Sequence, residues 1–159
     1  MRSTRTSRPS VATAMPETVF DIERTFAIDR VTMWSLWTDA AHAARWMRPS
    51  VTDYGPTDAT IDARPGGAYR FEMHGPDATY ATSGTYVDVD PMDRLSFTWR
   101  WDGSDEETLV EVRFADDADG TRVRITHTRF ASAESAERHG DGWRGCLDSI
   151  AAVFEPSPG

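Results

Sequence analysis

Apolar and polar residues alternate along two parts of the chain. In residues 19–28, the apolar side chains of Phe20, Ile22, Phe26 and Ile28 share one side of a two-residue period. Such alternation predicts a strand with one buried face. The same period returns in the middle of the chain and predicts six further strands, over residues 60–64, 68–74, 79–89, 94–101, 108–115 and 121–130. Because short turns join these strands, we expect an antiparallel meander.

Two short helices are predicted between the first strand and the meander. Asp29 can accept hydrogen bonds from the first turn of a helix over residues 30–38, which carries apolar residues at steps of three and four. Asp39 can cap a second short helix that ends near Trp46. The period then changes to two, which marks the return to strands.

A long helix is predicted at the end of the chain, starting either at Ala133 or after Gly142. Its apolar residues follow one another at spacings of four, three and four: Trp143, Leu147, Ile150 and Phe154. These spacings place them on one face of the helix. An antiparallel sheet with one apolar face must be covered, and this helix can cover it. The sequence therefore predicts an α+β fold.

The length of 159 residues suits a single domain, which we place at residues 17–156. Residues 1–16 carry three arginines among Ser, Thr and Pro and no acidic residue, so we expect a flexible tail. The chain contains one cysteine, which cannot form an internal disulfide. Its start lacks the apolar segment of a secretory signal, and we expect a cytoplasmic protein.

Charge argues against two classes of partner. All 17 basic residues are arginine, and 26 acidic residues leave a net charge of −9. A negative protein repels nucleic acid and anionic lipid surfaces. No apolar run approaches the roughly 18 residues that cross a bilayer. We therefore expect neither nucleic acid nor a membrane as a partner, while a homodimer remains open.

Six short clusters of aromatic residues, glycine and other residues recur along the chain in a fixed order. They are Trp46-Met47-Arg48-Pro49, Arg64-Pro65-Gly66-Gly67, Gly84-Thr85-Tyr86, Phe97-Thr98-Trp99-Arg100-Trp101, Ile125-Thr126-His127-Thr128 and Gly142-Trp143-Arg144-Gly145-Cys146-Leu147. In order and spacing this sequence resembles the family related to the C-terminal domain of the activator of heat-shock protein 90 ATPase, within the SRPBCC (START and birch-pollen-allergen-like) superfamily. The resemblance covers about residues 19–154.

The resemblance implies a helix-grip fold. In this fold a curved antiparallel sheet of about seven strands wraps around the long C-terminal helix, and two short helices follow the first strand. Members of the superfamily commonly keep a cavity between sheet and helix, so the resemblance also implies a pocket.

The residues that would line this pocket follow mainly from the parity of each strand. Inward-facing and helix-facing side chains give the candidate ligand cavity: Trp46, Tyr69, Phe71, Met73, Tyr80, Trp99, Trp101, Val112, His127 and Trp143. Histidine, tyrosine and indole groups would be its polar points in an otherwise apolar chamber. That mixture suits a small apolar or aromatic molecule.

The same residues have structural interpretations. Tryptophans fill cores with or without a ligand, and His127 has no carboxylate at a fixed spacing that would mark a catalytic base. Cys146 falls on the apolar helix face, where a thiol is unreactive. Glu72 and His74 should face outward, and the four histidines lack paired ligand spacing. We therefore expect no metal, no cofactor and no identifiable catalytic residues.

Three functions follow from the resemblance. The first is a module that binds a hydrophobic or aromatic small molecule, which we favour over an enzyme. The second is a cyclase- or aromatase-like enzyme that uses the same pocket, with His127 or a tyrosine as acid or base. The third is regulation of a chaperone ATPase. Eukaryotic activators carry an additional N-terminal domain, for which sixteen residues cannot substitute, so this function ranks third.

Overall fold

The computed structural model describes residues 19–156 and confirms the α+β fold. The predicted tail at residues 1–16 lies outside the described residues. The elements follow in the predicted order: β1 (Phe20–Phe26), α1 (Arg30–Thr38), α2 (Ala40–Trp46), β2 (Asp58–Ile61), β3 (Ala68–His74), β4 (Thr79–Asp90), β5 (Arg94–Trp101), β6 (Thr108–Asp117), β7 (Gly120–Thr128) and α3 (Ala133–Phe154).

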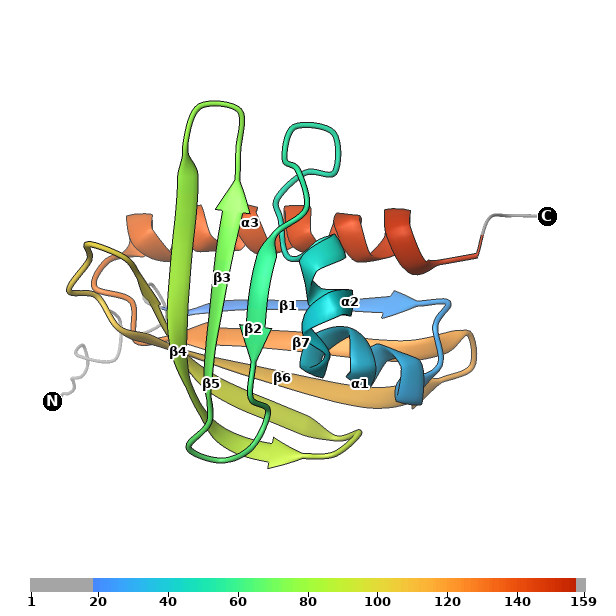
Figure 1. Ribbon diagram of the computed structural model, residues 1–159. Helices are drawn as coiled ribbons and strands as arrows, with labels where there is room; N and C mark the ends of the chain where they lie inside the picture. Colours follow the sequence, from blue (N-terminus) through green and yellow to red (C-terminus); the bar gives the residue numbers. More distant parts are fainter. Residues whose placement is uncertain (1–18, 157–159) are drawn as a thin grey trace, which may run out of the picture.

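All seven strands form one antiparallel sheet in the order β1-β7-β6-β5-β4-β3-β2. The first and last strands of the sequence are neighbours, and Phe20 lies opposite His127. A register shift between Tyr86 and Asp88 interrupts the β4–β5 ladder, and such irregularities increase bending and twist. In Figure 1, β2, β3 and β4 run across the direction of β1, β6 and β7, so the sheet curves around α3.

Several strand bounds differ by one to three residues from the expected ones, and two strands end early. β2 ends at Ile61 instead of residue 64, because the chain then turns, with Arg64 N donating to Asp62 O and Gly67 N donating to Arg64 O. β7 ends at Thr128 instead of residue 130, since Arg129 adopts a positive φ of 71°. That backbone conformation cannot continue a strand.

Side-chain caps fix where the helices begin. Asp29 accepts a hydrogen bond from Thr32 N (2.7 Å), and Asp39 accepts one from Ala41 N (2.9 Å), as predicted. Ser132 caps α3 through Ser135 N (3.1 Å). The terminal helix therefore takes the longer of the two predicted forms, with 22 residues. None of the helices in residues 19–156 is long and apolar enough to cross a membrane.

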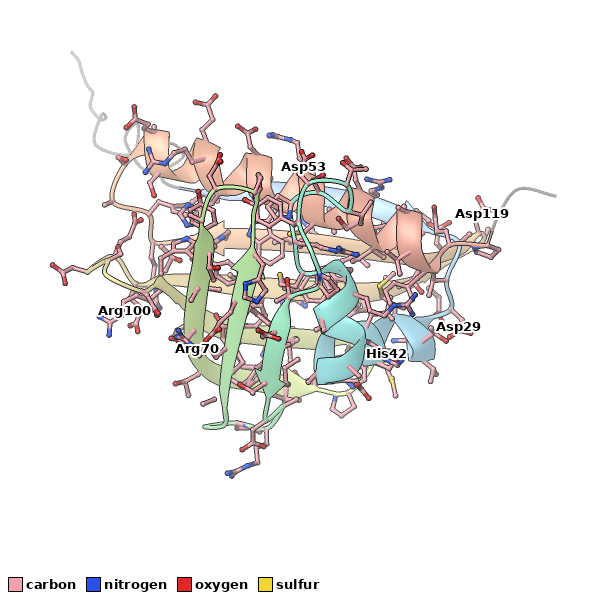
Figure 2. All side chains as sticks on the ribbon, turned by 45° about the horizontal axis from the view of Figure 1, so that its top comes forward. Asp29, His42, Asp53, Arg70, Arg100 and Asp119 are labelled. Atoms are coloured by element: carbon pink, nitrogen blue, oxygen red, sulfur yellow. The ribbon has the colours of Figure 1, made fainter. Side chains whose placement is uncertain are left out.

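The core lies between the inner face of the sheet and the three helices. Trp143, Leu147 and Ile150 of α3 are buried against it. Strand parity holds in the centre of the sheet, where Phe97 and Trp99 face the core. On the opposite face lie charged side chains, among them Arg70 and Arg100, which Figure 2 shows on the side of the sheet away from α3.

We predict that Trp143→Ala or Leu147→Ala lowers the free energy of unfolding by about 2–5 kcal/mol, because each leaves a cavity beneath α3. Urea denaturation measures this change. Glu137→Ala, at an exposed position of the same helix, should stay within about 0.5 kcal/mol of the wild type. A comparably small loss for both core variants would show that α3 does not close the core.

Alanine substitutions at two glycines of α3 should change the stability of the protein in opposite directions. A Cβ at Gly142 would meet nothing within 4 Å, whereas one at Gly145 would lie 2.2 Å from Pro49 O. Gly142→Ala should therefore stabilise the protein by up to about 1 kcal/mol, the difference in helix propensity. Gly145→Ala should destabilise it, since backbone must move. Thermal unfolding of both variants tests the pair, and equal shifts in melting temperature would contradict the described packing of α3.

Candidate functional site

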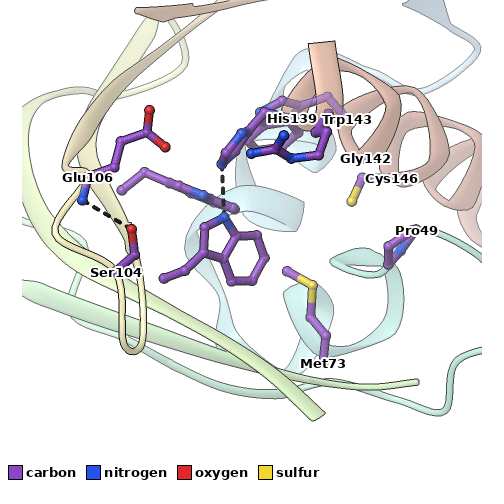
Figure 3. A pocket seen from close by; sticks show the side chains of 11 residues that line it. Pro49, Met73, Ser104, Glu106, His139, Gly142, Trp143 and Cys146 are labelled. Atoms are coloured by element: carbon purple, nitrogen blue, oxygen red, sulfur yellow. Dashed lines mark hydrogen bonds between the residues drawn. The ribbon is translucent and has the colours of Figure 1, made fainter. Parts of the chain in front are cut away.

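A pocket of about 290 Å³ opens between the first half of α3 and the inner face of the sheet. Figure 3 shows Met73 of β3 across the pocket from Trp143 and Cys146 of α3, with Ser104 at one side and Pro49 at the other. Apolar side chains form most of its wall: Met73, Trp99, Trp101, Trp143 and Cys146. Polar side chains join it from the β5–β6 loop and the start of α3: Ser104, Glu106, Arg138 and His139.

Four of the predicted cavity residues come together in this pocket: Met73, Trp99, Trp101 and Trp143. The Trp99 ring packs against the rings of the other two tryptophans. The Trp99 ring lies 5.2 Å from that of Trp143 and 5.5 Å from that of Trp101, with the latter pair edge to face. The pocket wall thus contains a continuous indole surface.

Five further predicted residues lie in the core and do not line the pocket: Trp46, Tyr69, Phe71, Val112 and His127. Parity places a side chain on the inner face without showing whether other side chains cover it. Tyr69 is an example, because its ring packs 5.0 Å from Phe71 and its hydroxyl donates to Thr98 O (2.5 Å).

Tyr80 does not line the pocket, in contrast to the prediction from strand parity. It shares the inner parity of β4, yet its side chain is 48% exposed and it is not part of the pocket wall. Tyr80 lies opposite Met73 near the β3–β4 turn. At this end the hairpin extends beyond the elements that cover the sheet centre, so inner parity no longer implies burial.

The strand pattern did not predict the polar residues of the pocket. They come from the β5–β6 loop and from the first turns of α3, which are helical only if the helix begins at Ala133 and not after Gly142. His139 stands four residues before Trp143 in α3. With the helix begun at Ala133, the i, i+4 rule places both side chains on one face. That spacing is the signal that could have found His139.

His127 is held by hydrogen bonds on both ring nitrogens. Trp143 Nε1 donates to Nδ1 (2.9 Å), and Nε2 lies 2.6 Å from Thr108 Oγ1. An indole can only donate, so Nδ1 must accept and the proton resides on Nε2. Burial lowers the pKa of His127 to about 2, and the nearby His139 adds to this effect. A neutral imidazole with both nitrogens occupied is poorly placed to act as a general acid or base.

His139, which lines the pocket, also has hydrogen bonds on both ring nitrogens. Trp101 Nε1 donates to its Nε2 (2.9 Å), while its Nδ1 donates to Ser135 O (2.8 Å). Burial lowers the pKa of this histidine as well. His139 therefore orients the Trp101 ring, and it leaves no free ring nitrogen for a ligand.

Glu106 anchors the β5–β6 loop to the start of α3. Partial burial tends to raise its pKa, but hydrogen bonds from Ala131 N (2.7 Å) and Ser135 Oγ (2.8 Å) outweigh this and lower it. The carboxylate is therefore ionised at neutral pH. Cys146 differs, since burial raises the pKa of its thiol to about 12. Such a thiol is not a nucleophile at neutral pH.

A second cluster of polar groups lies on the outer face of the sheet. The potential metal-ligating atoms of Asp58, Glu72 and His74 fall within 4.8 Å of one another. The sequence pattern does not indicate this cluster, because Asp58 comes from β2 and meets β3 only through strand pairing. Its atoms already take part in polar contacts: His74 Nε2 lies 2.8 Å from Asp58 Oδ2 within the cluster, and Arg70 Nε donates to Glu72 Oε2 (3.0 Å) from outside it. A cation would have to displace both interactions.

The burial of neutral His127 predicts a pH dependence of stability. Between its ordinary pKa of about 6.5 and about 2, the unfolded chain binds a proton that the folded chain does not, so stability falls as pH falls. From pH 7.5 to pH 5 this amounts to about 2 kcal/mol. His127→Gln should be less stable at pH 7.5 and should show a pH profile that is flatter by that amount.

Urea denaturation at several pH values measures these profiles. Glu137→Gln, at an exposed position, should retain the wild-type slope. If His127→Gln retains it as well, the histidine is not buried in the neutral form.

Comparison with known proteins places this arrangement in a family. The family model described as Activator of Hsp90 ATPase homolog 1-like protein matches residues 28–155. No curated protein matches the chain.

Solved structures with the same fold come from several bacteria. An AHSA1-like protein from Aeromonas hydrophila is 26% identical, with a TM-score of 0.73 and coverage of 89% of this chain and 97% of that one. The AHSA1 protein from Silicibacter pomeroyi is 25% identical, with a TM-score of 0.74 and coverage of 84% and 95%. A protein from Rhodobacter sphaeroides is 21% identical, with a TM-score of 0.75 and coverage of 87% and 92%.

The family model covers most of the chain, and the order of strands and helices agrees with the helix-grip fold of these relatives. The chain therefore belongs to the AHSA1 family of the SRPBCC superfamily.

Proposed function

We propose that this domain binds a small aromatic or apolar molecule in the pocket between α3 and the sheet. The observation that carries the proposal is the wall of three indoles, Trp99, Trp101 and Trp143, around an open volume of about 290 Å³. Ligand pockets range from about 300 to 1,000 Å³, so this volume suits a ligand of one or two fused rings.

The pocket supports binding better than catalysis. An enzyme of the cyclase type needs an acid or base that can reach the ligand. His127 lies behind the pocket wall with both nitrogens bonded, and Tyr69 has its hydroxyl on Thr98 O. Regulation of a chaperone ATPase rests on the description of the family alone, whereas the pocket is a feature of this chain.

The proposal predicts saturable one-to-one binding of naphthalene-sized aromatic compounds, measured by isothermal titration calorimetry. Gly142→Leu should weaken this binding at least about tenfold, because a side chain at this pocket position enters open space. Leucine is also a better helix former than glycine, so the fold should persist.

Glu137→Leu is the matched control, since it adds the same side chain to an exposed position of α3. It should bind as the wild type does. The proposal fails if the wild type shows no saturable binding of one- or two-ring aromatic compounds, or if Gly142→Leu binds them unchanged.

A further inference from the structure

One histidine and two carboxylates converge on the outer face of the sheet, on the side away from the pocket. The potential ligand atoms of Asp58, Glu72 and His74 lie within 4.8 Å of one another. Strand pairing brings them together, because Asp58 lies directly opposite Glu72, and His74 follows Glu72 by two residues on the same face. Gly55 N donates to His74 O (3.1 Å), which holds the segment before β2 against the end of β3. The backbone of both strands therefore fixes where the three side chains start.

Solvent reaches all three side chains. Those of Glu72 and His74 are each 39% exposed, and that of Asp58 is 76% exposed. Two ligand atoms of one Zn²⁺ ion lie about 3.3 Å apart, since each is about 2 Å from the metal in a tetrahedral site. His74 Nε2 and Asp58 Oδ2 are already 2.8 Å apart. Rotation of exposed side chains is enough to bring the third ligand atom into range, and the main chain need not move.

The second ring nitrogen of His74 has a partner of the kind that orients metal-binding histidines. Its Nδ1 lies 3.1 Å from Thr79 Oγ1, across the β3–β4 pairing. Histidines that bind a metal normally hold their other nitrogen in such a hydrogen bond, which fixes the ring. In the free protein the carboxylate of Asp58 can only accept, so Nε2 carries a proton. Metal binding at Nε2 moves this proton to Nδ1, and the Thr79 hydroxyl can switch from donor to acceptor.

The surrounding charges favour a divalent cation. Arg70 Nε donates to Glu72, and its two terminal nitrogens donate to the two oxygens of Asp102 (3.0 and 2.7 Å). A cation that displaces Arg70 from Glu72 therefore leaves the paired hydrogen bonds to Asp102 in place. The three carboxylates of Asp58, Glu72 and Asp102 and the single guanidinium of Arg70 leave two negative charges. A positive ion is attracted to such a site.

We propose that Asp58, Glu72 and His74 bind a Zn²⁺ ion, with water in the remaining coordination position. An imidazole nitrogen with carboxylate oxygens suits Zn²⁺, whereas Mg²⁺ and Ca²⁺ prefer oxygen ligands throughout. Spacing along the chain does not predict this site, because one ligand arrives from another strand. The ion would tie the edge strand β2 to β3. The inference is independent of the function proposed for the pocket.

Titration of the untagged protein with Zn²⁺, in competition with a chromophoric chelator, tests the proposal. The wild type should bind one ion through this site. His74→Gln and Asp58→Asn should each weaken binding at least about tenfold, because each removes one of three ligands. Zn²⁺ should also raise the melting temperature of the wild type more than that of either variant, since it binds the folded site.

Two variants serve as matched controls. His42→Gln removes another partly exposed histidine, whose Nδ1 lies 3.3 Å from Ser35 O. Glu111→Gln removes a carboxylate that pairs with an arginine, as Glu72 does: Arg94 Nη1 donates to it (2.9 Å). Both should bind Zn²⁺ within about twofold of the wild type, because neither residue belongs to the cluster.

A second measurement does not require a variant that folds. In assigned ¹⁵N spectra of the histidine rings of the wild type, Zn²⁺ should shift Nε2 of His74 and give its Nδ1 the signal of a protonated nitrogen. His42 should keep its signals. The same concentration of Mg²⁺ should leave both rings unchanged.

Three results would overturn the inference. The first is that His74→Gln and Asp58→Asn bind Zn²⁺ as the wild type does. The second is that the ring of His74 does not respond to the ion. The third is that Mg²⁺ displaces Zn²⁺ at equal concentration, which would mean that the imidazole is not a ligand. Binding of aromatic compounds in the pocket is measured separately, so none of these results decides the proposed function.

Discussion

The hydrogen bond from Trp143 Nε1 to His127 Nδ1 joins α3 to the sheet inside the core. It continues through Thr108, whose hydroxyl lies 2.6 Å from His127 Nε2 and donates to Trp99 O (3.1 Å). One chain of polar contacts thus links α3, β7, β6 and β5. Each group is buried, so breaking one bond would leave a partner unpaired in a medium without water, which is costly.

This chain fixes two of the three indoles of the pocket wall. Trp143 is oriented by the His127 bond, and the backbone of Trp99 receives the hydroxyl of Thr108. The third indole, Trp101, is held by His139 of α3. The protein alone therefore fixes the wall, and under the proposed function such preorganised groups would lose less freedom on binding. His127, the candidate acid or base in the sequence, and His139 both act here as acceptors that orient tryptophans.

The two halves of α3 have different roles. Leu147 and Ile150 are fully buried and close the core, while Gly142, one turn nearer the start, leaves open space at the pocket. Glu106 ties the loop beside the pocket to Ser135 and Ala131 at the start of the helix. A large side chain at residue 142 would fill the pocket, so the volume depends on glycine at this position as much as on the curvature of the sheet.

The sequence by itself determined the order of the elements, the antiparallel meander and the family. Period-two alternation and the capping residues Asp29 and Asp39 are local signals, which can be recognised without knowledge of the fold. Strand parity also assigned inner and outer faces correctly for Met73 and Trp99. Only the tertiary structure decided which inner side chains line the pocket. Tyr69 and Tyr80 share the predicted inner parity, yet one is covered by neighbouring rings and the other lies beyond them. How deeply a side chain on a curved sheet is buried depends on how the helices pack against that sheet. The same packing decides which residues far apart in the chain form hydrogen bonds, such as Trp143 and His127. A local sequence pattern contains no information on either.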